Sequence, residues 1–488
     1  MKKIFVLAIA ISLLFSLALT VVGGEAGEKD FLKSLESNFL EVEYVDFGTF
    51  EYGEDELNLN IRMKENKTAR WVFYGDGQEL ETIETNDVEF DWSEYGNFEL
   101  REFRVEIEEY SDVLEIDWRG HEDEDNLRGK IPAKLGNLEN LERLYLNNND
   151  MSGEIPVELG NLRNLERLSL ASNGQTGEIP AELGNLQNLE RLYLSSNELT
   201  GEIPAELGNL QNLERLSIAS NRLTGEIPVE LANMENLETL WLYSNELTGE
   251  IPVELANLEN LETLRLYSND LSGEIPAELG NLRNLEYLQL YSNKLSGQIP
   301  VELGNLERLE YLHIGDNELS GNIPVELGNL ENLKWSWLHG NKLSGEIPAE
   351  LSEVTELEIL KLDNNNLNSY GKGALSTQPN LREINISNND LSTEDVDNIL
   401  SDLVESLDLE GRVPAEVDLS GNADPSSNGL EDKQTLEAEG WKVRVGEKEE
   451  KDDIIDRIRD IPGFTTTLLL LAVIIAVAIY NKKTRRYS

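Results

Sequence analysis

The sequence predicts an α/β fold: a right-handed solenoid with a parallel inner sheet, preceded by a small all-β domain and followed by a C-terminal transmembrane segment. Regular spacing within the 488 residues predicts the solenoid. Asparagine recurs in one register from Asn149 to Asn389, and ten Ile-Pro pairs run from residue 131 to residue 348. Such periods are typical of arrays whose units bury their apolar faces only by stacking. The same 24-residue spacing separates Leu141, Leu165, Leu189, Leu213, Leu237, Leu261, Leu285, Leu309, Leu333, Leu357 and Leu381.

The pattern within one coil explains how it folds. It reads Leu-x-x-Leu-x-Leu-x-x-Asn-x-Leu-x-Gly-x-Ile-Pro-x-x-Leu-Gly-Asn-Leu, and the Leu-x-Leu step predicts a short strand with two side chains inward. We expect the asparagine to end the strand and its buried amide to bond backbone groups of neighbouring coils. The motif resembles the plant-type class of leucine-rich repeats. This resemblance covers the predicted solenoid, residues 114–391.

The C-terminal end of the array needs a cover, because the last coil has no neighbour on which to stack. The patterns of Thr393–Glu405 and Leu430–Ala438 predict helices, and Trp441–Val445 predicts a strand. Residues 392–446 are therefore the predicted capping region. Plant members of the family often close their ends with disulfides, which this chain cannot do because it has no cysteine.

The N-terminal residues 27–113 differ in character from the array. They are rich in aromatic and aliphatic residues that alternate with polar ones, which predicts a small β-sandwich-like domain. The segment Trp71-Val-Phe-Tyr-Gly-Asp-Gly77 resembles the PKD-type β-sandwich of surface proteins. Another kind of small β domain is the alternative.

The first residues predict export. Lys2 and Lys3 precede an apolar run, Ile4–Val22, and the small residues Gly24 and Ala26 follow it. This order is typical of a secretory signal peptide, which we assign to residues 1–26. An uncleaved membrane anchor is the alternative.

The last residues predict attachment to a membrane. Pro462, Gly463 and Phe464 open an apolar run to Tyr480 that a basic tail follows, and residues 447–461 form a charged spacer before it. Residues 462–488 resemble the archaeal PGF-CTERM sorting signal. That resemblance implies that an archaeosortase-like enzyme removes the tail and that the protein is joined to a membrane lipid. A plain transmembrane anchor is the alternative, and with either we expect a cell-surface protein on the extracellular side of the cytoplasmic membrane.

Composition excludes several classes of function. Lys and Arg number 41 against 94 Asp and Glu, so a net charge of −53 argues against a nucleic-acid partner. The lack of cysteine excludes thiol nucleophiles and thiolate metal sites. Many acids repeat with the coil, in three glutamate ladders: after the first strand leucine, before Ile-Pro, and within Pro-x-Glu-Leu. We expect these stacked charges to repel unless salt or cations screen them.

The sequence carries no recognisable catalytic chemistry. It has no nucleophile elbow, phosphate loop or zinc-protease motif, so we predict that the protein is not an enzyme and needs no cofactor. Histidines occur only at positions 121, 313 and 339. His313 and His339 fall in adjacent coils, with Asp363 one coil further. This grouping is more typical of surface residues than of a metal site, and we predict none.

The concave face is the predicted binding surface. The outward positions beside the strand leucines vary between coils, and from the fifth to the ninth coil they collect aromatic residues. Tyr and Trp supply large contact areas with a polar tip and dominate binding hot spots. The alternative is a cross-strand ladder that only stabilises the sheet. The candidate partner-binding residues are Trp241, Tyr243, Tyr267, Tyr287, Tyr291, Tyr311, His313, Trp335, Trp337 and His339.

These features predict an exported, anchored module that recognises a protein or a glycan through coils around residues 237–341. The alternative function is a structural component of the cell envelope or surface layer. Two sequons, at Asn66 and Asn385, suit an exported glycoprotein, and Asn385 falls on a concave strand.

Overall fold

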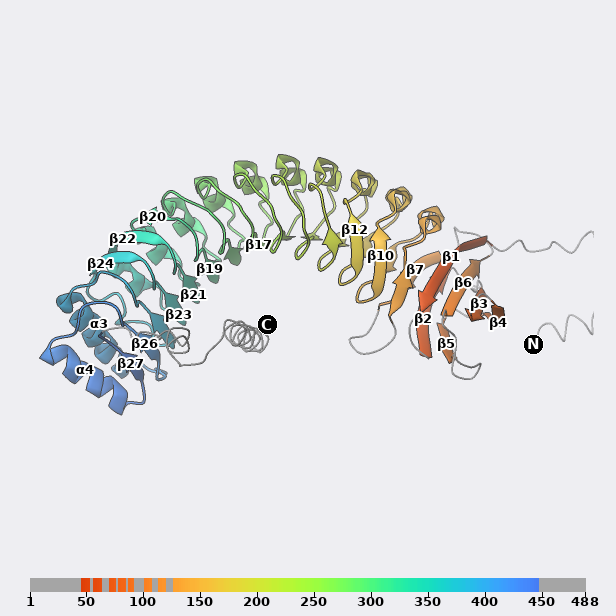
Figure 1. Ribbon diagram of the computed structural model, residues 1–488. Coiled ribbons are helices and arrows are strands. Elements are labelled where there is room, and N and C mark those ends of the chain that lie inside the picture. Colours follow the sequence, from red (N-terminus) through yellow and green to blue (C-terminus); the bar gives the residue numbers. More distant parts are fainter. Residues whose placement is uncertain are drawn as a thin grey trace, which may run out of the picture.

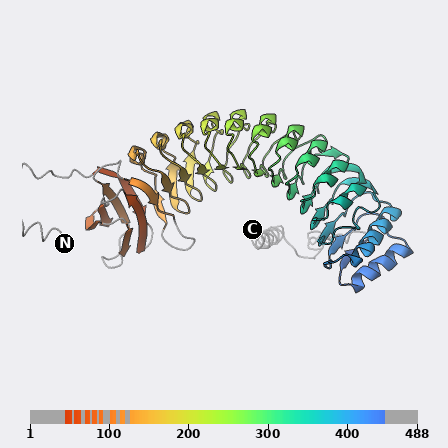
Figure 2. The ribbon, with the colours of Figure 1, turned by 180° about the vertical axis from the view of Figure 1, so that it is seen from behind.

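The computed structural model describes residues 45–52, 56–63, 70–75, 78–84, 87–91, 101–107, 113–119 and 126–446. These residues form an arc of stacked coils, with strands on the inner side and short helical turns on the outer side (Figures 1 and 2). The predicted signal peptide, spacer, sorting signal and the Asn66 sequon lie outside the described residues. Within the described ranges, no helix is long and apolar enough to cross a membrane.

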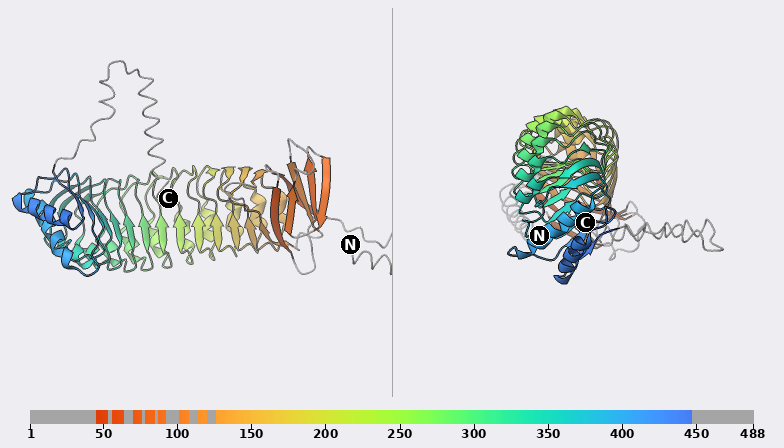
Figure 3. Two further views of the ribbon diagram at one scale, coloured as in Figure 1. Left: turned by 90° about the horizontal axis from the view of Figure 1, so that it is seen from below. Right: turned by 90° about the vertical axis from the view of Figure 1, so that its left-hand side faces the viewer.

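The inner strands form one sheet in which each strand pairs with that of the next coil, as the view onto the concave side shows (Figure 3). From β7 onward all pairs are parallel and in register, so that Leu240, Leu264 and Leu288 lie opposite one another and are fully buried. The parallel solenoid predicted from the repeat is confirmed. Its inner strands are β7 Val113–Asp117, β9 Arg143–Tyr145, β11 Arg167–Ser169, β13 Arg191–Tyr193, β15 Arg215–Ser217, β16 Thr239–Trp241, β17 Thr263–Arg265, β18 Tyr287–Gln289, β19 Tyr311–His313, β21 Trp335–Trp337, β23 Ile359–Lys361, β25 Glu383–Asn385, β26 Glu416–Asp418 and β27 Lys442–Arg444.

The Ile-Pro step turns the chain onto the convex side. Each proline has φ between −60° and −68°, the value that its ring imposes, and a short 3-10 helix follows it. The isoleucine before it is buried in the core. These helices are η3 Ala133–Asn137, η4 Val157–Asn161, η5 Ala181–Asn185, η6 Ala205–Asn209, η7 Val229–Asn233, η8 Val253–Asn257, η9 Ala277–Asn281, η10 Val301–Asn305, η11 Val325–Asn329 and η12 Ala349–Glu353. Short strands lie between the two sides: β8 Leu127–Gly129, β10 Asp150–Glu154, β12 Gly174–Gly177, β14 Glu198–Leu199, β20 Ser320–Gly321, β22 Lys342–Ile347 and β24 Asn366–Tyr370.

The N-terminal strands continue both sheets of the solenoid. β2 pairs antiparallel with β7 on the concave side, and β1 pairs antiparallel with β8. Trp71 and Trp118 are buried with ring centroids 5.8 Å apart, so aromatic packing joins the two parts. The β region therefore covers the first coil; its PKD-type identity stays a prediction. Its strands are β1 Val45–Tyr52, β2 Glu56–Met63, β3 Arg70–Gly75, β4 Gln78–Glu84, β5 Asp87–Asp91 and β6 Arg101–Ile107.

Two helices cover the opposite end. α3, Thr393–Glu405, has the predicted bounds and begins with a capping box between Ser392 and Asp395. α4, Ser427–Ala438, begins three residues before the predicted Leu430, because the Ser426 side chain caps it by accepting the Asn428 N–H. The short helix η13, Ser406–Asp408, follows α3, and β27 is shorter than the predicted strand.

The asparagine at the end of each strand links its own coil to the preceding one. In the coil of Asn245, its Nδ2 donates to Ile218 O at 3.1 Å and to Leu242 O at 3.0 Å, and its Oδ1 accepts from Leu223 N at 3.1 Å. The side chain is only 8% exposed. The predicted ladder of buried amides is therefore confirmed.

One core position breaks the repeat. Gln175 replaces the leucine found at Leu199 and Leu223, and it is fully buried with neither amide atom bonded within the described residues. An unpaired amide in an apolar core costs about 1–3 kcal/mol. We therefore expect Gln175→Leu to raise the free energy of unfolding by about that amount in thermal or urea denaturation. The reverse change one coil on, Leu199→Gln, should lower it, and unchanged midpoints for both variants would contradict this account.

Candidate binding surface on the concave face

The ten predicted partner-binding residues form one continuous surface, here called the aromatic cluster. They come from β16, β18, β19 and β21 and from the positions two residues beyond β16, β17, β18 and β21. Because the strands are in register, each residue lies beside its equivalent in the next coil. Ser336, which replaces a strand leucine, leaves this register unbroken. The irregularity that a serine among leucines would suggest is absent from the backbone of β21.

The first row of the cluster is a stack of rings. Tyr243 and Tyr267 have centroids 4.4 Å apart, Tyr267 and Tyr291 4.3 Å, and Tyr291 and His313 3.8 Å. Burial raises the pKa of the Tyr267 and Tyr291 hydroxyls, so both stay neutral. The next coil has Gly315 at the tyrosine position, and His313 of the same coil continues the row.

Gly315 also sets the place of the second histidine. A Cβ added to Gly315 would lie 2.8 Å from Cε1 of His339, so the His339 ring occupies the space that a side chain would fill. His339 Nε2 lies 3.6 Å from an Asp316 oxygen. Among the residues that the structure describes, no group of three histidine or acidic side chains is placed to hold a metal ion.

A second row lies alongside the first. Tyr287 stacks on Tyr311 at 4.5 Å, and Tyr311 meets Trp335 edge to face at 4.7 Å. His313 contacts Trp337 edge to face at 4.6 Å, and Trp337 stacks on Trp335 at 5.6 Å, so Trp337 joins the two rows.

The cluster is less exposed than the sequence suggested. Nine of its residues are half-buried, and His313 is buried, with 8% of its surface exposed. Burial, followed by the charges of His339 and Lys361, lowers the pKa of His313 to about 3, so it is neutral at physiological pH. Stacking between neighbouring coils covers ring faces of the tyrosines. The ladder that the sequence offered as an alternative to binding is thus present in the structure.

Two cations border the cluster that the sequence did not single out. The Arg265 guanidinium lies 4.8 Å from the Trp241 ring centroid and 5.9 Å from that of Tyr287. Lys361 Nζ lies 4.7 Å from the Trp337 ring and 2.9 Å from Glu383. The sequence could have pointed to Arg265, because it is a basic residue among aromatic ones on the concave face of an acidic chain.

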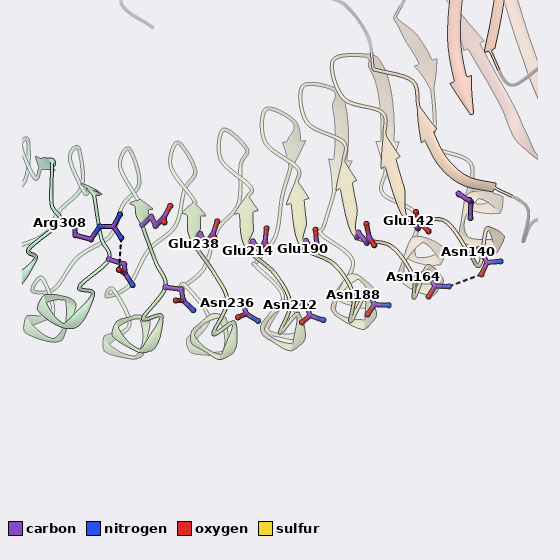
Figure 4. A pocket seen from close by; sticks show the side chains of 15 residues that line it. Asn140, Glu142, Asn164, Asn188, Glu190, Asn212, Glu214, Asn236, Glu238 and Arg308 are labelled. Atoms are coloured by element: carbon purple, nitrogen blue, oxygen red, sulfur yellow. Dashed lines mark hydrogen bonds between the residues drawn. The ribbon is translucent and has the colours of Figure 1, made fainter. Parts of the chain in front are cut away.

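A polar groove runs beside the concave strands, lined by one row of glutamates and one of asparagines (Figure 4). Arginines on the adjoining strands reach the glutamate of the next coil: Arg143 lies 3.1 Å from Glu166, and Arg191 lies 3.6 Å from Glu214. This glutamate ladder therefore has arginine partners over four coils. The exposed asparagines bond backbone carbonyls, as Asn188 does with Arg163 O at 2.9 Å.

The concave sequon lies on β25. Asn385 is half-buried, and its Oδ1 accepts the Ser387 N–H at 3.1 Å. Ser387 itself is buried, with 6% of its surface exposed. Use of this sequon stays a prediction.

The fold is similar to that of plant receptors whose structures have been solved. The plant peptide hormone receptor RGFR1, in complex with RGF2, is 34% identical over 65% of this chain and 53% of its own, with a TM-score of 0.54. The ectodomain of the Arabidopsis receptor kinase HAESA, with an IDA peptide hormone ligand, is 33% identical over 61% of this chain and 52% of its own, also with 0.54. The chain thus spans about half the length of these receptor structures. An internalin, InlF from Listeria monocytogenes, shares the fold at 24% identity, over 70% of this chain and 88% of its own, with a TM-score of 0.53.

The family follows from the repeat itself. No curated protein gave a significant match to the chain. The family model described as leucine-rich repeat region matches residues 123–223, 158–279 and 271–413, which together are more than half of the chain. The chain therefore belongs to the leucine-rich repeat family.

Proposed function

We propose that this protein is an exported, surface-anchored binding module whose concave face holds a protein partner through the aromatic cluster. The observation that carries the proposal is the continuity of the cluster: ten side chains from consecutive coils meet on one surface, where scaffold positions would simply repeat. Aromatic edges and hydroxyls offer both apolar contact and hydrogen bonding, as interface hot spots do. The plant receptors named above were solved with peptide hormones, which supports a peptide or protein as the partner class.

The stacking favours a protein over a glycan. A sugar ring packs on an open aromatic face, whereas Tyr267 has rings on both faces, from Tyr243 and Tyr291. One face of Trp241 is covered by Arg265. A glycan partner would therefore have to bind mainly through hydroxyl contacts.

Anchoring belongs to the same proposal. The signal peptide at residues 1–26 and the PGF-type signal at residues 462–488 would export the chain and attach it to the membrane after archaeosortase-like processing. A structural component of the envelope is the second candidate, because repeat arrays present long, regular convex surfaces.

The concave face is tested by capture of partners from native cell envelopes on the immobilised full chain. The combined variant Trp241→Ala, Tyr267→Ala and Tyr291→Ala should lose proteins that the wild type retains, because it removes central anchors of the cluster. Tyr193→Ala is the matched control, since Tyr193 is a half-buried concave tyrosine outside the cluster. Thermal melting checks that both variants fold. Equal capture by all three proteins would overturn the proposal, and unchanged assembly into envelopes by the combined variant would favour the structural role.

A further inference from the structure

Along most of the concave face, the outward-facing positions carry no Asp or Glu, although the chain is strongly acidic. In the nine coils from β9 to β21, the two outward strand residues and the residue two positions beyond contain five arginines and no Asp or Glu. The chain as a whole carries −53. These positions of the face that we assign to the partner therefore carry no carboxylate, although the chain is acidic.

Four of the five arginines are already paired. Arg143, Arg167, Arg191 and Arg215 each contact the ladder glutamate of the next coil at 3.1–3.8 Å. Each of them is the first residue of its strand and lies next to the glutamate row, so the guanidinium can reach the glutamate carboxylate of the next coil. The charges of these four arginines are therefore neutralised by glutamates of the protein itself.

Arg265 differs from these four. It is the third residue of its strand, two residues further along than the other four in theirs, and no carboxylate of the described residues lies within ion-pair distance of it. Its contacts are the rings of Trp241 and Tyr287, which hold the guanidinium but accept no ordinary hydrogen bond from it. Its Nε is buried and has no acceptor within the described part of the chain, as is also true of Arg143, Arg167 and Arg191, so the difference lies in the missing carboxylate.

A second donor lies beside it in the same state. Trp241 Nε1 is also buried and without an acceptor among the described residues. Native proteins seldom leave buried donors unpaired, because each one costs free energy unless a partner supplies the acceptor. Arg265 and Trp241 thus hold buried, unpaired N–H groups side by side, in adjacent coils of the proposed binding face.

We propose that Arg265, with Trp241 Nε1 beside it, binds a side-chain carboxylate of the partner, so that the partner presents an Asp or Glu in the segment seated on the aromatic cluster. This inference rests on the proposed function of the concave face. The planar guanidinium matches a carboxylate with two parallel hydrogen bonds. A singly charged group is favoured over a phosphate because the field of the acidic chain opposes each added negative charge.

The test uses the immobilised full chain and arrays of acetylated, amidated octapeptides with Glu, Gln or phosphoserine at one fixed position and mixtures elsewhere. A free-acid array with Gln at that position provides terminal carboxylates. Binding is measured in about 0.5 M NaCl, where long-range repulsion is screened within about 4 Å. We expect the wild type to retain Glu peptides at least about tenfold more strongly than Gln peptides, as for a desolvated charge pair.

Arg265→Gln should abolish this preference, and Arg265→Lys should keep only part of it because a point charge replaces the planar fork. Arg163→Gln, at an exposed position away from the concave strands, should behave as wild type, and thermal melting verifies folding. Equal retention of Glu and Gln peptides, a preference for phosphoserine or free-acid peptides, or an unchanged preference in Arg265→Gln would overturn the assignment. Loss of all peptides by the combined aromatic variant would then leave the proposed function standing, whereas their full retention by that variant would remove the function itself.

Discussion

Replacing one ladder asparagine, Asn245→Ala, is expected to lower the free energy of unfolding by about 3 kcal/mol or more, through buried backbone groups that lose their partners. The amide of Asn245 serves carbonyls of two coils and the N–H of Leu223 in a region closed to water. Alanine cannot replace these bonds, and the space is too enclosed for each group to find solvent. Chemical denaturation monitored by circular dichroism measures the change.

Asn236→Ala is the matched control, since it removes an asparagine from the same coil. Asn236 is exposed, and its Nδ2 donates to Gln211 O at 2.8 Å. Water can satisfy that carbonyl after the change, so we expect a loss of about 1 kcal/mol or less. If both variants lost the same stability, burial of the ladder would not explain its effect.

The scaffold was predictable because each of its requirements repeats. A leucine that must be buried, or an asparagine that must bond two coils, recurs in every coil and reveals its role by its period. The helix α3 was predictable because its pattern is local, with a capping serine followed by apolar residues at helical spacing.

The binding surface was only partly predictable, because its geometry depends on differences between neighbouring coils. The sequence places Tyr291 and His313 at different strand positions, yet their rings stack, and His339 fills the space that Gly315 leaves open. Arg265 gains its importance from the absence of a nearby carboxylate, which no single coil reveals. Gln175 similarly reads as a surface residue until its position in the core is known.

The N-terminal strands show a further limit. Alternation predicted strands in residues 27–113, but pairing of β1 with β8 and β2 with β7 joins segments far apart in sequence. Such long-range registers carry no local signal. The solenoid thus gains a cover that shares both of its sheets.

The glutamate ladders of the convex side lead to the second large prediction, a strong dependence of stability on salt. The ladder before Ile-Pro and the ladder of Pro-x-Glu-Leu line one groove, with Glu178 and Glu202 in the first and Glu182 and Glu206 in the second. Among the residues that the structure describes, no Lys or Arg forms an ion pair with these glutamates. The stem of Glu178 lies against Gly201 of the next coil, whose missing side chain makes room for it, so the acids are held in line.

Neighbouring carboxylates about 4.8 Å apart repel by about 0.9 kcal/mol in water before screening. Repeated along both ladders, this repulsion amounts to several kcal/mol at low ionic strength, and salt removes most of it. We therefore expect the melting temperature to rise steadily from low to about 1 M NaCl, and to rise at lower concentrations of CaCl₂.

The combined variant Glu178→Gln, Glu202→Gln and Glu226→Gln isolates the cause, because it removes charge from consecutive coils without changing shape. It should melt above the wild type at low salt and show a weaker response to NaCl. Glu190→Gln with Glu214→Gln is the matched control: it removes carboxylates that arginines neutralise, at 3.8 and 3.6 Å, and should not raise the low-salt melting temperature. A wild-type melting temperature that stayed flat or fell with salt would mean that the side chains relieve the repulsion by spreading apart, and that the acidity of the repeat has no cost to the fold.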